Sequence, residues 1–223
     1  MNNILVNEQF GFREKSSTEM ETYYLLNTVL SSLDKQKIAG GLFCDLQKAF
    51  DCVNHNILLA KLEFYGVSGI VNKLLKSYLN NRYQRTVIKD NMNNKISSEW
   101  ELVKHGVPQG SILGPLLFLV YISDLSRTIS KLANTVLFAD DTSIIISNSN
   151  QGEFKTNIIS VMNEITNWFQ SNLLTLNCNK THFLQFLTKN KKEIQIQIMS
   201  SNSLISNLNN THFLGLTIDN ALS

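Results

Sequence analysis

The sequence predicts an α+β fold in which an antiparallel sheet is backed by helices. The first observation is the stretch VLFADDTSIII at 136–146, where two apolar, β-branched runs flank a short polar turn. This pattern is typical of two strands that pair through a tight turn. The second is the segment 154–172, whose apolar residues follow the spacing of an amphipathic helix. The third is the length of 223 residues, which is enough for a proper hydrophobic core.

Composition argues against a membrane-spanning or secreted protein. The chain is 43% hydrophobic, but no run approaches the ~18 to 20 apolar residues that span a bilayer, and the first ten residues lack the core of a signal peptide. An odd number of cysteines without a CxxC pair argues against a disulfide framework: Cys44, Cys52 and Cys178. We therefore expect an intracellular protein, in the nucleus or the cytoplasm, without contact with a membrane. Because the net charge is only +2, a polyanionic partner must be held by local basic patches.

The first predicted helix begins at the sequence SSTE, in which Ser16 and Glu19 have the spacing of a capping box. It carries a largely apolar stripe and ends near the Ala-Gly-Gly at 39–41. The stripe consists of Met20, Tyr23, Tyr24, Asn27, Leu30 and Leu33. A short apolar strand follows at 41–46, and it carries Asp45 near its end. Because an unpaired charge on a buried strand is costly, this aspartate is a candidate functional residue.

A pair of helices and a pair of strands are expected next. The helices run from Asn54 or Asn56 to Gly66 and over about 70–79. The strands cover 83–89 and 96–103 around a polar link. Four basic residues lie in or beside these strands: Arg82, Arg85, Lys89 and Lys95. The residues alone leave open whether they form a solvated hairpin or a surface that contacts phosphates.

The segment 105–115 is a shaped loop ahead of a buried helix at 116–122. Both prolines of the chain and three of its ten glycines fall in it. Such a composition indicates backbone that approaches another group closely. A loop followed by a core helix accounts for the hydrophobicity, but not for Gln109 between a proline and a glycine at the mouth of the helix.

The polar turn of the predicted hairpin contains two adjacent aspartates, Asp140 and Asp141. Ionised carboxylates crowded at the tip of a buried hairpin repel each other and raise each other's pKa, unless a cation binds there. A hard divalent ion such as magnesium matches these oxygen ligands. On local grounds alone, an isolated Asp-Asp-Thr is more often a polar turn without a function, so the support for a metal site must come from the rest of the chain.

The end of the chain is expected to be mainly β. Four strands follow the amphipathic helix, over 174–177, 182–187, 194–199 and 211–218. There is no internal repeat and no linker long enough to require a second domain. We therefore expect a single domain over 1–223.

Three features now occur in order: an aspartate at a strand end, a Pro-Gln-Gly loop ahead of a buried helix, and an Asp-Asp hairpin. This is the order of the polymerase motifs A, B and C, and the chain resembles the reverse transcriptase domain of non-LTR (LINE-like, jockey-type) retrotransposons. The stretches that carry the resemblance are QFGFREKSSTEM, FCDLQKAFDCVNH, HGVPQGSILGPLLF, FADDT, LNCNKTHF and FLGLTID, from Gln9 to Asp219. The ADD triplet alone is weak, whereas all six stretches in order are very specific.

The resemblance implies an RNA-directed DNA polymerase that joins dNTPs to a primer 3′ hydroxyl with two Mg²⁺ ions, which Mn²⁺ could replace. Asp45, Asp140 and Asp141 would be catalytic and would bind the metals together with the Leu46 carbonyl. Lys180 would protonate the leaving pyrophosphate. The implied partners are an RNA template, a DNA primer and dNTPs. No structural zinc is expected, because the histidines beside the motifs lack Cys or His partners at ligand spacing.

The same resemblance implies supporting roles for other residues. Phe50 would be the steric gate that excludes a ribose 2′-OH and so favours dNTPs. Gln109 and Gly110 would contact the incoming nucleotide and the template, and Arg13 would touch the triphosphate. The primer grip would be formed by Phe213, Leu214 and Gly215.

In terms of polymerase parts, we expect one reverse transcriptase domain with a palm, partial fingers and no thumb. The partial fingers would cover about 1–40 and 70–105, and the palm about 41–69 and 106–223. By this resemblance we expect the chain to begin at the second fingers motif and to stop just after the primer grip, without a thumb or an endonuclease domain. This departure from the family leaves the activity of the chain by itself open.

The sequence is also compatible with two alternatives to an active polymerase. One is a truncated, catalytically inactive retroelement remnant that at most binds nucleic acid through Arg82, Arg85, Lys89 and their neighbours. The other is a different palm-type metal enzyme, such as a nucleotide cyclase. The Pro-Gln-Gly loop and Phe50 argue against the cyclase.

Overall fold

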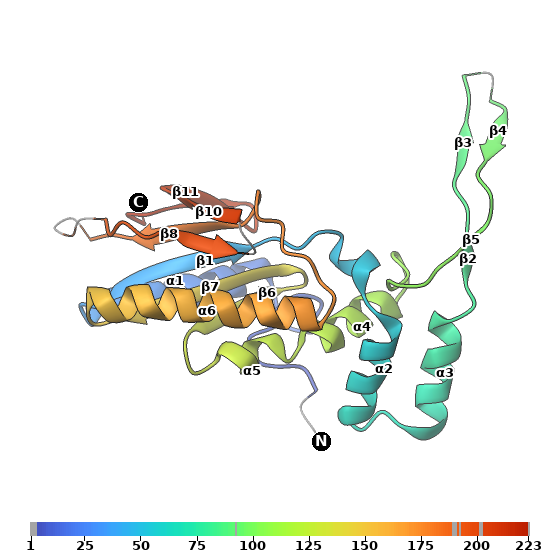
Figure 1. Cartoon of the computed structure of the whole chain (residues 1–223), viewed down its shortest axis with the longest axis horizontal. Helices are drawn as coiled ribbons and strands as arrows, with labels where there is room; N and C mark the ends of the chain where they lie inside the picture. The colour runs from blue at the N-terminus through green and yellow to red at the C-terminus, as the bar shows by residue number, and fades with distance from the viewer. Residues whose placement is uncertain (1–3, 92, 189–190, 192, 201–202, 223) are drawn as a thin grey trace.

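The computed structural model describes residues 4–91, 93–188, 191, 193–200 and 203–222. Their centre is a six-stranded sheet with the order β6–β7–β1–β8–β10–β9 (Figure 1). Neighbouring strands are antiparallel except β8 and β10, which are parallel. The strands are Asn134–Phe138 (β6), Asp141–Asn148 (β7), Ile38–Cys44 (β1), His182–Phe186 (β8), Ser203–Leu208 (β10) and Ile198–Ser200 (β9). The predicted α+β fold, with a mainly antiparallel sheet backed by helices, is confirmed.

Helices surround this sheet and extend from one end of it. They are Thr18–Asp34 (α1), His55–Phe64 (α2), Gly69–Leu79 (α3), Leu113–Ile122 (α4), Leu125–Ile129 (α5) and Gln151–Ser171 (α6). Side-chain oxygens of Ser17, Asn54 and Asn150 accept hydrogen bonds from backbone N–H groups in the first turns of α1, α2 and α6. These caps satisfy donors that a helix N-terminus otherwise leaves unpaired.

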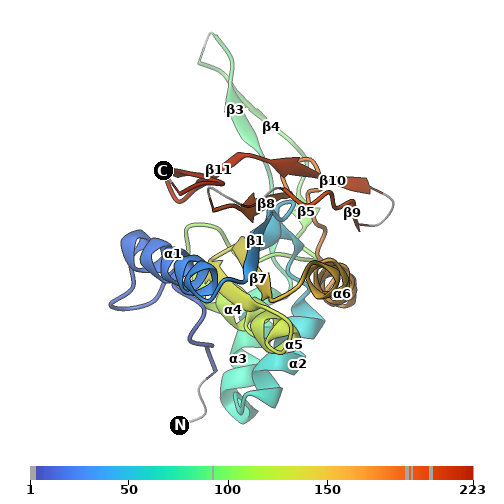
Figure 2. The same ribbon diagram turned by 90° about the vertical axis from the view of Figure 1, so that its left-hand side faces the viewer.

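The central strands β1 and β7 are buried on both faces, and their side chains alternate between two hydrophobic cores. Leu42 and Ile144 belong to the larger core, which includes the apolar face of α6. Phe43 and Ile145 belong to a smaller core that includes α1. Figure 2 shows α1 and α6 on opposite sides of β1 and β7. Strands buried on both faces have continuous apolar runs, which explains the three consecutive isoleucines of β7.

The apolar stripe predicted for α1 is wrong. Five of its six members are exposed, among them Met20 by 51%, Tyr23 by 71% and Leu30 by 47%. The helix instead packs Leu25 and Val29 against β1, β6 and β7. Apolar side chains occur all around this helix, so their spacing alone did not identify the face that meets the sheet.

The predicted ends of this helix also need correction. Its cap is Ser17 rather than Ser16, and it ends at Asp34, before the Ala-Gly-Gly sequence. The residues Ile38–Cys44 form β1 instead, because this segment pairs with β7 on one side and with β8 on the other. Tertiary pairing therefore overrides the helical pattern at this point.

The paired strands predicted after α3 are confirmed, and they form a long exposed hairpin. Its strands are Tyr83–Gln84 (β2), Val87–Lys89 (β3), Lys95–Ser97 (β4) and Glu101–Leu102 (β5). β2 pairs with β5, and β3 pairs with β4. We call residues 82–91 and 93–104 the arm. It projects well beyond the sheet and the helices in both views (Figures 1 and 2).

The C-terminal strands differ from the prediction. The expected strand at 211–218 is a hairpin of Asn210–Phe213 (β11) and Leu216–Asp219 (β12), with positive φ angles at its turn. The segment 174–177 contains only an isolated bridge from Leu176 to Leu46. β10 and α5 were not predicted. The division into fingers and palm stays a prediction, although α1, in the expected fingers range, packs on the central sheet.

Candidate active site

Asp45 and Asp141 lie at the same end of two neighbouring strands. In the antiparallel pairing of β1 with β7, Cys44 is opposite Thr142. Asp45 follows Cys44 and Asp141 precedes Thr142, so the two aspartates extend the same ladder by one position. Asp140 directly precedes Asp141 and lies in the tight turn between β6 and β7. The structure thus brings Asp45 close to the adjacent pair Asp140 and Asp141, which is distant from it in sequence, and we call these three aspartates the acidic edge.

The electrostatics of the acidic edge agree with this convergence. The pKa of Asp141 is raised by burial, by the negative charge of Asp140 and by that of Asp45, in this order. Carboxylates crowded in this way repel one another, and a bound cation would relieve that repulsion.

Glu21 adds a fourth carboxyl group that was not identified from the sequence. It lies on α1 and is 0% exposed, and burial together with the charge of Asp141 raises its pKa to about 8. In the part of the chain that the structure describes, neither of its carboxylate oxygens has a hydrogen-bond partner. The stripe predicted for α1 placed this residue on the wrong face, which is why it was missed.

The N-terminal QFG sequence holds the turn of the acidic edge in place. The buried Gln9 accepts hydrogen bonds from the backbone N–H of Gly11 (2.8 Å) and of Ala139 (3.1 Å) through its Oε1. Phe10 N donates to Leu137 O at 2.8 Å. A Cβ on Gly11 would lie 2.3 Å from Ala139 N, so only glycine fits this close approach. The role of this motif here is structural: it fixes the turn in which φ of Ala139 is +54°.

Arg13 follows the same sequence but faces a different part of the molecule. Its Nη1 donates to the backbone oxygens of Val6 (2.7 Å) and Gln9 (3.2 Å). It also borders an apolar cavity of about 560 Å³ between the N-terminal segment and α2, α3 and α4. Its expected contact with a triphosphate stays a prediction.

A smaller cavity of about 210 Å³ adjoins the acidic edge. The side chains around it include Asp45, Asp141, Lys180, Phe213 and Leu214. Lys180 Nζ is 4.0 Å from Asp45 Oδ2. The structure therefore places the candidate proton donor and two of the three candidate primer-grip residues beside the aspartates. Gly215 is in the turn of the same hairpin, with φ +87°.

Asn177 is a further residue of this site that the sequence reasoning did not single out. Its Nδ2 donates to Asp45 Oδ2 at 3.0 Å, and its backbone N–H donates to Asp45 O at 2.8 Å. The bridge between Leu46 and Leu176 holds the two segments together. The sequence offered one indication of this role: Asn177 lies in the stretch LNCNK, three residues before Lys180.

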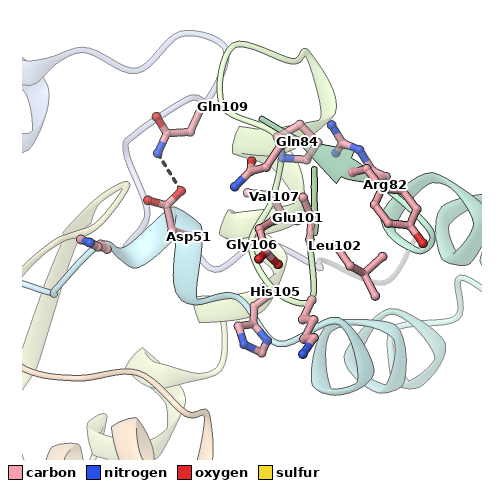
Figure 3. A pocket seen from close by; sticks show the side chains of 14 residues that line it. Asp51, Arg82, Gln84, Glu101, Leu102, His105, Gly106, Val107 and Gln109 are labelled. Atoms are coloured by element: carbon pink, nitrogen blue, oxygen red, sulfur yellow. Dashed lines mark hydrogen bonds between the residues drawn. The ribbon is translucent and has the colours of Figure 1, made fainter. Parts of the chain in front are cut away.

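Phe50 and Gln109 lie on adjoining segments and are both held by neighbours. The ring of Phe50, in the short 3₁₀ helix Ala49–Cys52, stacks on Phe118 with centroids 4.4 Å apart. Gln109 Nε2 donates to Asp51 Oδ1 at 2.9 Å (Figure 3). This bond joins the Pro-Gln-Gly loop to the segment that follows Asp45.

Glycines shape the same loop in two ways. Gly106 has φ +85°, and a Cβ there would lie 2.9 Å from backbone atoms of Asp51. Gly110 has φ +79° and no atom within 4 Å of such a Cβ. Gly110 is therefore needed for its backbone conformation, whereas Gly106 is also needed for close packing.

The sequence matches the family described as reverse transcriptase (RNA-dependent DNA polymerase) over residues 1–218. The chain belongs to the reverse transcriptase family. The resemblance to the domains of non-LTR retrotransposons is confirmed by two relatives. One is the probable RNA-directed DNA polymerase from transposon BS of Drosophila melanogaster, 28% identical over 99% of this chain and 24% of that protein. The other is the RNA-directed DNA polymerase from mobile element jockey of Drosophila funebris, 32% identical over 61% of this chain and 15% of that protein.

Solved structures share the fold of this reverse transcriptase domain. Apo telomerase from Candida tropicalis, truncated from its C-terminal domain, superposes with a TM-score of 0.62 at 15% sequence identity. The match covers 95% of this chain and 39% of that chain. The chain thus spans about a quarter of the length of the first relative and well under half of this telomerase.

The acidic edge of the reverse transcriptase domain offers carboxylate oxygens, which fit magnesium. Among the described residues, no three side chains of His, Cys, Asp or Glu are arranged to hold a metal ion by themselves. Magnesium usually takes only one or two protein carboxylates and completes its shell with water and substrate phosphates, so the donor set is compatible with it.

No helix in the described ranges combines the length and the apolar character needed to cross a membrane. The expectation of an intracellular protein, in the nucleus or the cytoplasm, stays a prediction.

Proposed function

We propose that this reverse transcriptase domain is an RNA-directed DNA polymerase that adds dNTPs to a primer 3′ hydroxyl by a two-metal mechanism. The observation that carries the proposal is the convergence of Asp45 with Asp140 and Asp141 at one end of β1 and β7. Mg²⁺, or Mn²⁺ in its place, would when bound lower the pKa of the attacking hydroxyl and stabilise the charge on the attacking and leaving oxygens.

The aspartates of the acidic edge have the chemistry to hold these ions. Asp45 and Asp140 are the proposed main ligands, with Asp141 beside them and the Leu46 carbonyl in the nucleotide-bound site. Asn177 fixes one oxygen of Asp45 through its 3.0 Å hydrogen bond, which leaves the other oxygen for a ligand. Metal binding would also relieve the repulsion that raises the pKa of Asp141.

Lys180 is the proposed acid for the leaving group. Its ammonium group lies beside Asp45 and its side chain is 71% exposed, so it can turn toward a bound phosphate. Transfer of a proton from Lys180 Nζ to the departing oxygen of pyrophosphate would neutralise the charge that develops there. Arg13 would need to leave its present carbonyl partners before it could assist at the triphosphate.

Two side chains provide the proposed selection of the nucleotide. Phe50 is held against Phe118, and this stacking would keep its ring where a ribose 2′-OH would otherwise lie. Gln109 and Gly110 lie in the loop whose position is fixed by Asp51, and they would contact the incoming nucleotide and the template. Phe213, Leu214 and Gly215 would grip the primer.

The partners proposed for this chain are an RNA template, a DNA primer and dNTPs. Telomerase from Candida albicans, which shares the fold with a TM-score of 0.57, has been solved in complex with a fragment of telomeric RNA. That complex agrees with a nucleic-acid template for this fold. No structural zinc is proposed for the described residues.

Primer extension on poly(rA)/oligo(dT) with dTTP and Mg²⁺ tests the proposal. The wild-type chain should extend the primer, and Asp140→Asn should abolish extension. Asp34→Asn, on the exposed end of α1, is the matched control and should keep full activity. The alternative, an inactive retroelement remnant, predicts no extension by the wild type together with RNA binding that weakens with salt.

A further inference from the structure

The turn of residues 178–180 is held against the end of β1 on both of its sides. Before the turn, Asn177 N donates to Asp45 O at 2.8 Å, and after it, Asp45 N donates to Thr181 Oγ1 at 3.3 Å. The N–H groups of Lys180 and Thr181 both donate to Asn177 O and close the turn. Cys178 is the first residue of this turn and is therefore kept beside the end of β1.

The pairing register places Cys178 at the level of Cys44. Leu176 forms an antiparallel bridge with Leu46, and backbone hydrogen bonds flank this pair on both sides. Two positions before Leu46 and two positions after Leu176 are Cys44 and Cys178, so the same register makes them a second pair of the non-hydrogen-bonded type. In such pairs the Cα atoms are about 4.5 Å apart, and a disulfide needs a Cα separation of about 4.4 to 6.8 Å. Cys178 is the last position at which this register applies, because the chain turns there.

The two thiols also share one environment. Both cysteines pack in the larger core, and all three cysteines of the chain are free. Burial raises the pKa of the Cys44 thiol to about 12, and the charge of an ionised Cys178 raises it further, so the two sulfur atoms lie within electrostatic range. The third cysteine, Cys52, instead donates to Gln47 O at 3.5 Å.

We infer that Cys44 and Cys178 form an oxidation site, at which a peroxide converts the two thiols to a disulfide that fixes the turn 178–180. Cys178 is half-buried and meets the oxidant first, whereas Cys44 is 5% exposed and is shielded from soluble reagents. In a reducing compartment such a disulfide is transient, which is typical of a redox-sensing pair and not of a structural framework.

The reaction with hydrogen peroxide takes place in two steps. One peroxide oxygen is transferred to the Cys178 sulfur, which gives a sulfenic acid, and the other leaves as water. The Cys44 sulfur then attacks the Cys178 sulfur, the S–O bond breaks, and the hydroxyl group leaves with the Cys44 proton as a second water. The two thiols together lose two electrons and two protons, and the peroxide takes up both.

The disulfide should act on Lys180, and this consequence rests on the proposed function. Lys180 is the last residue of the turn, and its Nζ is 4.0 Å from Asp45 Oδ2. As the proposed acid, it has to move from Asp45 toward the departing pyrophosphate. A bond between Cys178 and Cys44 ties the turn to β1, so the kcat of primer extension should fall about tenfold or more and recover after reduction by dithiothreitol.

Peptide mapping by mass spectrometry tests the oxidation site without any catalysis. The native chain is treated with hydrogen peroxide in the presence of a metal chelator, and the remaining thiols are blocked with N-ethylmaleimide. The peptides of Cys44 and Cys178 should be joined and two hydrogen atoms lighter than their sum, and Cys52 should carry the blocking group. Because the bond closes a loop of more than half the chain, the oxidised protein should melt about 5 °C or more above the reduced protein.

Cys52→Ser is the matched control and should form the same disulfide with the same rise in Tm. Cys178→Ser should form no disulfide, show no rise in Tm, and keep the kcat of the reduced wild type after peroxide treatment. Cys44→Ala, which places no hydroxyl group in the core, should also form no disulfide. Joined peptides that contain Cys52, disulfides between two chains, three free thiols after treatment, or a sulfinic acid at Cys178 beside a blocked Cys44 would each overturn the inference.

The two proposals fail separately. If the wild type extends no primer, the proposed function fails, but mapping and melting still decide whether the disulfide forms. Amide hydrogen exchange at Lys180 and Thr181 then decides whether the disulfide fixes the turn: exchange should slow on oxidation, and unchanged exchange would overturn that part. If the wild type is active and the disulfide forms, an unchanged kcat would overturn the action on Lys180.

Discussion

The acidic edge and the arm are the two charged regions of this molecule, and they are built in opposite ways. The acidic edge stands at the end of strands that are buried on both faces, and Gln9 and Gly11 fix its turn. The arm consists of four exposed strands held by their own backbone pairing. Negative charge at the edge is therefore concentrated and costly, whereas positive charge on the arm is spread and solvated. Changes at the edge should affect chemistry and stability, and changes on the arm should affect stability little.

The largest effect is expected on catalysis at the acidic edge. Asp45→Asn keeps the shape of the side chain but removes a charge that we propose to bind Mg²⁺, so the rate of primer extension should fall by about 10³-fold or more. In melting experiments, Mg²⁺ should raise the Tm of the wild type more than that of Asp45→Asn/Asp140→Asn. Equal Tm shifts in the two proteins would count against a shared metal site.

The second effect is a pH dependence of stability that comes from Glu21. Its pKa is about 8 in the folded chain against an ordinary value of 4.5, because of burial and then the charge of Asp141. The folded state thus holds a proton that the unfolded state releases. The contribution of this proton to the free energy of unfolding is complete below the pKa of Glu21 in the unfolded chain. It is lost as the pH rises through the pKa of Glu21 in the folded chain, at about 1.4 kcal/mol per pH unit. Urea unfolding from about pH 5 to about pH 8 should show this decline in the free energy of unfolding.

Variants separate Glu21 from its neighbours in that experiment. Glu21→Gln should remove most of the decline in the free energy of unfolding between these pH values. Glu19 is exposed on the same helix, so Glu19→Gln should leave the decline unchanged. The raised pKa of Asp141 acts in the same direction and should leave a smaller residual slope. A wild-type curve that is flat over this pH range would contradict the burial of a neutral Glu21.

The third effect concerns the turn of the acidic edge. In Gly11→Ala the new methyl group would meet Ala139 N at 2.3 Å, and the backbone would have to move. We expect a loss of about 1 to 3 kcal/mol in the free energy of unfolding. Gly152→Ala is the control, because its nearest contact in α6 would be 3.5 Å and alanine favours a helix. If both variants lost the same stability, the close packing of the QFG segment would be refuted.

The smallest effect is expected on the arm, and the two tryptophans of the chain make the comparison direct. Trp100→Ala should change the free energy of unfolding by less than about 0.5 kcal/mol, because the ring is exposed. Trp168→Ala should cost about 3 to 5 kcal/mol, because that ring is 7% exposed and lies in the larger core. Denaturant unfolding measures both; similar losses would show that the arm is part of the cooperative core.

Much of the site could be predicted because its motifs are local. Three parts of it are predicted by a pattern of apolar, polar and turn residues within about ten positions: the Asp-Asp turn, the Pro-Gln-Gly loop and the strand before Asp45. Their identity as parts of one polymerase site came from the order of the motifs. The helix cap at Asn54 and the paired strands of the arm are local in the same sense.

The errors have a common origin in contacts made by distant segments. The face of α1 was assigned from helical spacing, but Leu25 and Val29 are buried because β1, β6 and β7 pack there. The end of that helix was placed too late because β1 starts at Ile38, where β7 and β8 pair with it. The role of Asn177 depends on Asp45, 132 positions away.

The amino-acid sequence by itself determined which residues could carry charge at a strand end, in a turn or on a hairpin. The reason is that backbone conformational preferences and the alternation of apolar and polar residues act between near neighbours. Only the tertiary structure decided that Asp45, Asp141 and Glu21 share one electrostatic environment, and that the arm stands clear of it. The physical reason is that the pKa of a carboxyl group depends on its burial and on charges in space, and neither can be read from separation along the chain.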